Sequence, residues 1–178
     1  MKRLTHCSLA TLLIVAGCYA EKPERQASRP RRAPVIAATS QIDAIEAAIL
    51  AGTNRFRREN NLPPLLPDAG LYRFGRSRSQ DMASRQYFSH TEPGGKGVFV
   101  LMKDAGIGFA FAAENIHMSS GLPVAQIADT AVKGWIHSPG HRANMLSPSP
   151  THIGIGVAQG GDKGAYYSTQ VFTKPRGR

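Results

Sequence analysis

The chain has 178 residues and a formal net charge of +10, from 22 basic against 12 acidic side chains, and it contains two cysteines. The first 40 residues hold seven of the basic and two of the acidic side chains, so residues 41–178 keep a net charge of only +5. That moderate excess, together with the export signal described next, excludes nucleic acid as an expected partner. Residues 41–178 have a normal size for one domain with one core.

The first segment is typical of an export signal. Lys2 and Arg3 precede an apolar run from Leu9 to Ala16 that is too short to span a bilayer. The run ends in Val15-Ala16-Gly17-Cys18, which resembles the lipobox of bacterial lipoproteins. We therefore expect residues 1–18 to be a lipoprotein signal with lipidation at Cys18; the alternative is an ordinary secretory signal. The expected location is the bacterial cell envelope, periplasmic or surface-facing, with a lipid anchor in the membrane.

Residues 19–40 predict a disordered basic tether. They hold three prolines and four arginines but almost no large apolar side chain before Val35, so they cannot bury enough surface to fold. Their charge favours anionic head groups or wall polymers. Because Cys7 is lost with the signal and Cys18 carries lipid, the domain that follows has no disulfide and depends on core burial.

The next segment, Gln41 to Asn60, predicts an amphipathic helix. Apolar residues recur every three or four positions, and we expect the intervening charged residues to face water. The apolar stripe is Ile42, Ile45, Ile49, Thr53 and Phe56, and the charged set is Arg55, Arg57, Arg58 and Glu59.

A second helix is expected to begin after Asp68, its N-cap, and to run to about Gln86. Its inner face should carry Leu71, Phe74 and Met82. Its basic residues predict a solvated surface, with a polyanion-binding patch as the alternative. These residues are Arg73, Arg76, Arg78 and Arg85.

The middle of the chain places two polar residues among apolar ones. Tyr87 and Phe88 are expected to bury the end of the second helix, and His90 follows at a loop mouth. Gly97 to Ala105 predicts a short helix. Glu114, between alanines and an isoleucine, should be partly buried, and burial disfavours its charged form unless a cation or metal lies beside it.

The sequence of the last third of the chain predicts one helix, one turn and one β-hairpin. The helix starts at Pro123 and should end near His137, because Pro139 and Gly140 break the backbone and present His141 from the following turn. His152–Ala158 and Ala165–Phe172 predict two antiparallel strands around a glycine turn. Helices followed by an antiparallel sheet indicate an α+β fold.

Four motifs in this order resemble the CAP superfamily (cysteine-rich secretory, antigen 5 and pathogenesis-related proteins, SCP-like) in its disulfide-free bacterial branch. They are Tyr87-Phe88-Ser89-His90, Ala113-Glu114-Asn115-Ile116, Trp135 with Ser138-Pro139-Gly140-His141-Arg142-Ala143-Asn144, and Ile153-Gly154-Ile155-Gly156-Val157. The resemblance covers about residues 44–174. It implies a three-layer α-β-α sandwich with a central antiparallel sheet over residues 41–178.

The resemblance also implies a cleft lined by two histidines and two glutamates, which binds divalent metal in some members. His90, Glu114 and His141 match three of these as catalytic or metal-binding residues, and the second glutamate falls on Ser138. Two histidines and one carboxylate could hold zinc with an open position, whereas the missing carboxylate weakens acid–base chemistry. His137 beside Ser138 is either a surface residue or a replacement ligand. Residues expected to support the cleft are Asn115, Trp135, Ser138, Arg142 and Asn144.

Three functional hypotheses follow. The first is a monomeric, lipid-anchored binding module whose cleft takes a divalent metal such as zinc or a lipid, cell-wall or small-molecule ligand. The second is a metal-assisted hydrolase of peptide or wall material that uses His90, Glu114 and His141. The third is a purely structural network. The sequence leans away from an enzyme, because residues 41–178 contain no nucleophile elbow, zinc-protease helix, phosphate loop or cysteine.

Overall fold

The computed structural model describes residues 35–161 and 164–176, with side chains from residue 41 onward. The predicted signal peptide, Cys18 and most of the predicted tether lie outside the described residues. No described helix is both long and apolar enough to cross a membrane. The elements are α1 (Val35–Glu59), β1 (Leu66–Pro67), α2 (Ala69–Ser84), α3 (Val98–Asp104), β2 (Phe109–Ser119), α4 (Val124–His137), α5 (Pro139–Leu146), β3 (His152–Gly160) and β4 (Ala165–Pro175).

The sheet has the strand order β1-β3-β4-β2. The predicted hairpin of β3 and β4 is confirmed, and β4 also pairs antiparallel with β2. β1 was not predicted; it is two residues long and pairs parallel with the start of β3, which makes the sheet mixed. β2 was not predicted as a strand either, because Ala113–Ile116 is buried at every position and shows no alternation of apolar and polar residues.

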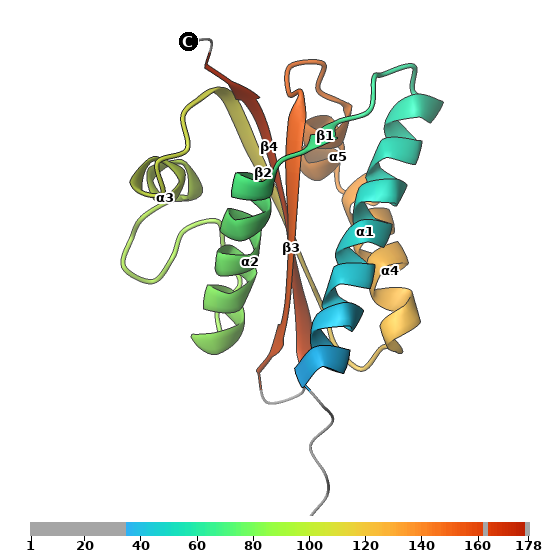
Figure 1. Cartoon of the computed structure of the whole chain (residues 1–178), viewed down its shortest axis with the longest axis vertical. Helices are drawn as coiled ribbons and strands as arrows, with labels where there is room; N and C mark the ends of the chain where they lie inside the picture. Colours follow the sequence, from blue (N-terminus) through green and yellow to red (C-terminus); the bar gives the residue numbers. More distant parts are fainter. Residues whose placement is uncertain (1–34, 162–163, 177–178) are drawn as a thin grey trace, which may run out of the picture. The chain divides into compact units, whose positions relative to one another are not determined.

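The domain has three layers. Figure 1 shows α1, α4 and α5 on one face of the sheet and α2 and α3 on the other, which confirms the predicted α-β-α arrangement. The main core lies under α1 and α4, where Ile153, Ile155 and Trp135 are fully buried. Thus the inward-facing residues of β3 and the apolar faces of α1 and α4 pack together in one cluster.

On the other face, the glycines of β3 let α2 approach at backbone distance. A Cβ on Gly154 would lie 2.1 Å from the carbonyl carbon of Leu71, and one on Gly156 would lie 1.9 Å from that of Gly75. No side chain fits there, so α2 rests directly on the strand. Asp68 caps the start of α2 as predicted, with Oδ1 accepting from the Leu71 N–H at 2.8 Å.

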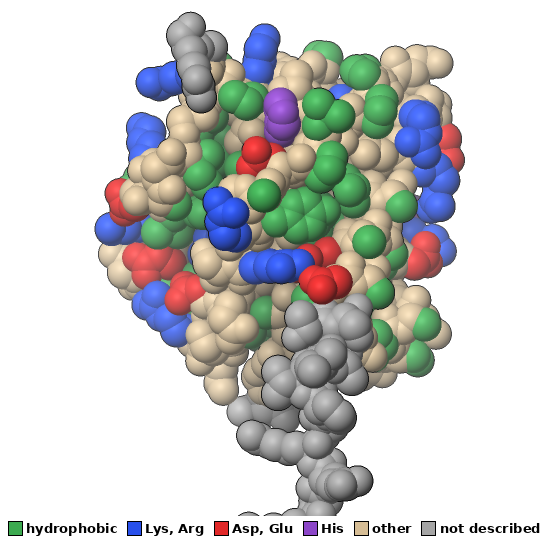
Figure 2. All heavy atoms as spheres, in the orientation of Figure 1, with side chains coloured by type: hydrophobic (Ala, Val, Ile, Leu, Met, Phe, Trp, Pro, Cys, Tyr) green, Lys and Arg blue, Asp and Glu red, His purple; other side chains and the backbone are tan. Residues whose placement is uncertain are grey.

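Ion pairs tie α1 to α2 across the edge of the sheet. Arg76 Nε donates to Glu46 Oε1 at 3.0 Å, and the same Glu46 oxygen accepts from the Val157 N–H of β3 at 3.1 Å. Figure 2 shows this side of the domain, where basic and acidic side chains lie next to one another below a group of hydrophobic ones. Glu46 therefore joins both helices to β3.

Four sequence predictions need correction, besides the placement of His141 that is described with the site. Arg57 and Arg78 do not face water, because both are buried. Arg57 donates to the Met145 and Ser147 carbonyl oxygens at 2.7 and 2.9 Å, and so serves acceptors at the end of α5 that the helix itself leaves free.

The other two corrections concern local structure. Phe88 is 46% exposed, so Tyr87 alone covers the end of α2. α1 begins at Val35 rather than Gln41, since residues 35–40 contain no glycine or proline to stop it.

Candidate functional site

The predicted cleft residues meet at the outer edge of β2, between the two helical layers. His90 comes from the loop between α2 and α3, Glu114 from β2 and His141 from α5. The predicted end of α4 at His137 is confirmed, but His141 lies in α5 rather than in a turn, because Pro139 suits the first position of a helix. The rings of His90 and His141 have centroids 6.2 Å apart and planes inclined by 57°.

Glu114 is the buried centre of the site. Its side chain is 1% exposed, with Oε2 2.8 Å from His90 Nδ1 and Oε1 3.1 Å from Arg78 Nε. An ionised carboxylate only accepts hydrogen bonds, so the shared proton belongs to His90 Nδ1. In neutral His90 this leaves the lone pair on Nε2, the nitrogen available to a ligand. The sequence predicted a partly buried Glu114 with a partner; the partner is confirmed, and the burial is complete.

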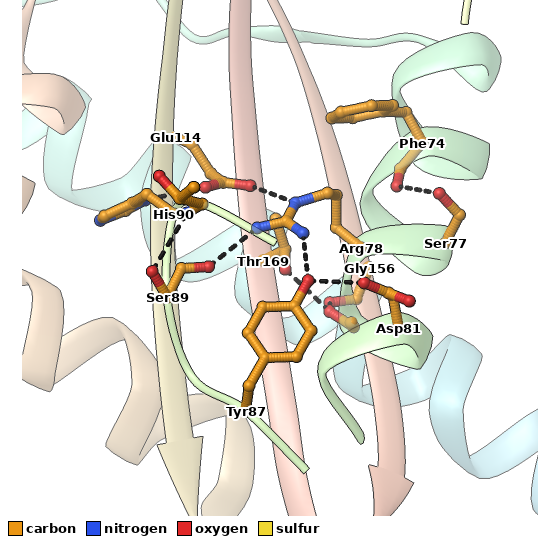
Figure 3. A network of polar contacts seen from close by, with 12 residues as sticks. Phe74, Ser77, Arg78, Asp81, Tyr87, Ser89, His90, Glu114, Gly156 and Thr169 are labelled. Atoms are coloured by element: carbon orange, nitrogen blue, oxygen red, sulfur yellow. Dashed lines mark hydrogen bonds and ion pairs between the residues drawn. The ribbon is translucent and has the colours of Figure 1, made fainter. Parts of the chain in front are cut away.

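Arg78 of α2 holds Glu114 from behind and was missed by the sequence analysis as a site residue (Figure 3). Its Nη1 donates to Tyr87 Oη at 2.7 Å and its Nη2 to the Ser89 carbonyl at 2.9 Å, while Tyr87 Oη donates to Asp81 Oδ2 at 2.6 Å. Burial is the largest single influence and lowers the pKa of Arg78, but the contacts with Glu114 and Tyr87 together raise that pKa above its usual value. A continuous polar chain therefore runs from Asp81 to the His90 ring.

A second network fixes the opposite wall of the site. Asn115 Nδ2 donates to the His141 carbonyl at 3.1 Å, and Asn144 Nδ2 donates to Asn115 Oδ1 at 2.8 Å. Trp135 Nε1 donates to the Ile116 carbonyl at 3.0 Å. These contacts join α4 and α5 to β2 and set the position of His141, whose pKa is lowered by burial and, secondarily, by His90. Lowering favours the neutral imidazole, which is the form that binds metals or accepts protons.

Other predicted residues lie outside this contact set. The guanidinium of Arg142 stacks over the Phe56 ring, 5.2 Å from its centroid. Ser138 joins α4 to α5, and its side chain makes no capping hydrogen bond. His137 is exposed, with Nδ1 2.7 Å from the Lys133 carbonyl of its own helix, which confirms its interpretation as a surface residue.

Comparison with known proteins identifies the family. The model of the cysteine-rich secretory protein family, CAP, matches residues 50–172. The chain belongs to the CAP family. Its sequence is 38% identical to the uncharacterized protein YkwD of Bacillus subtilis over 124 residues, which are 70% of this chain and 46% of that protein. It is 32% identical over 129 residues to the uncharacterized membrane protein YlbC of the same organism, covering 72% of this chain and 34% of YlbC.

Two solved structures have the same fold. An extracellular protein containing an SCP domain from Bacillus anthracis matches with a TM-score of 0.69 and 28% identity, over 80% of this chain and 44% of that one. An outer surface protein from Borrelia burgdorferi matches with a TM-score of 0.63 and 17% identity, over 75% of this chain and 94% of that one. The chain spans less than half the length of YkwD and of the Bacillus anthracis protein.

The donor set of this CAP domain does not fit the expected three-ligand metal centre. In the described part of the chain, no three His, Cys, Asp or Glu side chains are grouped so as to hold a metal ion. Both oxygens of Glu114 are engaged, one by Arg78 and one by His90. Any ion would therefore meet two imidazoles, with Glu114 orienting one of them from behind.

A pocket of about 320 Å³ opens beside His90 in this CAP domain. Glu114 and Asn144 line its polar end. Its other walls are apolar and come from α3 and β2; they are Val98, Phe99, Phe111, Ala112 and Ala113. The site thus combines one oriented imidazole with a largely apolar pocket, a combination common in small-ligand sites.

Proposed function

We propose that this CAP protein is exported, held at the cell envelope by lipid on Cys18, and binds a small ligand or a divalent ion at His90 and His141. Export is supported by the signal-like start of the sequence and by the extracellular and outer-surface relatives. Lipidation is supported by Val15-Ala16-Gly17-Cys18. Labelling with an alkyne fatty acid in a bacterial host should mark the wild type and not Cys18→Ala; equal labelling would refute the anchor.

The observation that carries the binding function is the exposure of an oriented histidine. His90 is 50% exposed although its Nδ1 is fixed by a fully buried carboxylate. A purely structural network has no need to leave that ring in solvent, 6.2 Å from a second imidazole and beside a pocket. We therefore favour a binding cleft over a structural one.

The same geometry gives a hydrolase less support. A general base must reach the proton that it removes, and Glu114 is 1% exposed with both oxygens in hydrogen bonds. The site offers imidazole nitrogens for binding but no free carboxylate. A defined reaction is therefore not part of the proposal.

Zinc titration calorimetry on the purified protein tests the divalent-ion part. Binding should disappear in His90→Ala and in His141→Ala, and it should remain in His137→Ala, which removes an exposed histidine four residues before His141. Zinc binding that survives both cleft substitutions, or no zinc binding at all, would refute this part of the proposal.

A further inference from the structure

The outer edge of β2 is the free edge of the sheet next to the cleft, because β2 is the last strand in the order β1-β3-β4-β2. Its outward groups follow from the ladder. On β3, the Val157 N–H donates to Glu46 and the Ile153 carbonyl accepts from the Asp68 N–H, so the odd-numbered residues of β3 point away from β4. The even-numbered residues of β3 therefore bond to β4.

The same alternation continues across β4. The even-numbered residues of β3 lie opposite odd-numbered residues of β4, such as Gly154 opposite Val171, so the even-numbered residues of β4 bond to β2. These lie opposite Ala113 and Asn115. The backbone groups of Ala112 and Glu114 consequently point out of the sheet, toward the cleft.

Part of this edge is already covered. The Glu114 carbonyl accepts from Asn144 Nδ2 at 3.3 Å, and the Ile116 carbonyl accepts from Trp135 Nε1 at 3.0 Å. No contact among the described residues covers the Ala112 N–H, the Ala112 carbonyl or the Glu114 N–H. One residue therefore presents both a donor and an acceptor, with a second donor two positions along, which is the pattern that a further strand would pair with.

The pocket of about 320 Å³ lies along this open edge. It is lined by Ala112 and Glu114, by Phe99 of α3 and Phe111 of β2, and by His90. Phe99 is 47% exposed, and its ring lies 6.1 Å from that of Phe109. At about 30 Å³ for each water-sized group, the volume holds on the order of ten such groups, which is more than enough for one large apolar side chain.

We infer that the cleft binds an extended peptide, which adds a strand to β2 at Ala112 and places one large apolar side chain between Phe99 and Phe111. This inference rests on the proposed function, since it names the ligand class for the same cleft. Main-chain hydrogen bonds to Ala112 and Glu114 supply affinity, the pocket supplies specificity, and His90 Nε2 contacts a neighbouring peptide group. An acyl chain would fill the pocket but leave the Ala112 backbone groups unpaired, so a peptide fits the edge better.

The test uses a capped peptide, acetyl-Thr-Thr-Phe-Thr-Thr-amide, titrated into the ¹⁵N-labelled protein and followed by NMR. The amide signals of Ala112 and Glu114 should shift, and their hydrogen exchange should slow. The same peptide with N-methylated backbone amides keeps its phenylalanine but loses its donors. It should bind about tenfold more weakly or worse.

Three variants separate the backbone from the pocket. Ala112→Pro removes the outward N–H and spares the ladder, because proline is tolerated where an edge N–H faces solvent, and it should weaken binding about tenfold. Phe99→Ala should weaken binding to a similar degree. Val100→Ala is the matched control, since Val100 is also 47% exposed on α3 but does not line the pocket, and it should bind like the wild type.

Several outcomes would overturn strand addition. The first is equal binding of the N-methylated and the unmodified peptide. The second is unchanged peptide binding by an Ala112→Pro variant that has a native circular dichroism spectrum. The third is displacement of the peptide by decanoate whose affinity is the same for Ala112→Pro and the wild type, which would assign the groove to an acyl chain. Zinc calorimetry and peptide titration of the wild type keep the two proposals apart. Zinc binding without peptide binding in the wild type refutes strand addition alone, whereas the absence of both refutes the binding cleft.

Discussion

Replacing Arg78 by methionine should destabilise the domain strongly, because it leaves the Glu114 carboxylate buried without its cation. The two side chains are 3% and 1% exposed, and Arg78 also donates to Tyr87 and to the Ser89 carbonyl. Breaking a buried ion pair by removing one partner costs about 3–5 kcal/mol. With a urea m value of about 2 kcal/mol/M, the unfolding midpoint should fall by about 2 M.

Urea unfolding followed by the fluorescence of Trp135, the single tryptophan and fully buried, measures this change. Arg73→Met on the exposed face of α2 is the control and should alter the free energy of unfolding by no more than about 0.5 kcal/mol. The double variant Arg78→Met/Glu114→Gln should be more stable than Arg78→Met alone, because no unpaired charge remains buried. A double variant as unstable as the sum of its two single changes would refute the ion pair as the cause.

Three further changes follow from the described contacts. Gly156→Ala should cost about 1–3 kcal/mol or more in a thermal melt, because its Cβ would lie 1.9 Å from the backbone of Gly75, whereas Gly108→Ala, with open space around it, should cost far less. Glu92→Gln should flatten the pH dependence of the melting temperature between about pH 4.5 and 2. Two loop N–H groups and then a guanidinium lower the pKa of Glu92 to about 2 in the folded protein. The stabilisation that the ionised Glu92 contributes is therefore present above pH 4.5 and disappears as the pH falls through 2. Arg57→Met should lower the free energy of unfolding, measured in urea, by about 2–4 kcal/mol, because it leaves the buried carbonyl groups that accept from the guanidinium without a donor. A loss below about 0.5 kcal/mol would contradict that role.

The sequence predicted the helices and strands that have one buried, apolar face, and it missed the strand that is covered by helices on both faces. α4 was predicted with its end at His137, and β3 with its inward isoleucines, because each has one buried face. β2 is covered by helices on both faces, so its residues follow no period of two. Its role as the strand that carries Glu114 therefore needed the three-dimensional structure.

The cleft residues were predicted through the family motifs, but the residue that organises them was not. Arg78 lies four residues after Phe74 and four before Met82, on the stripe that the sequence analysis itself assigned to the inner face. Its charge suggested solvent, whereas its position indicated the core, and position was the better guide. Glu46, directly after the buried Ile45, shows the same conflict. Charged residues at core positions of a helix are thus worth treating as candidates for buried ion pairs.

The backbone contact between α2 and β3 also affects the free energy that ligand binding at the cleft costs in ordering the protein. With no side chains between them, the backbone of α2 packs directly against Gly154 and Gly156 of β3. α2 carries Arg78, whose ion pair with Glu114 positions the carboxylate, and the carboxylate in turn orients the His90 ring through its hydrogen bond to Nδ1. The imidazole is thereby pre-organised, and a ligand that docks against it spends little of its binding energy on ordering the protein.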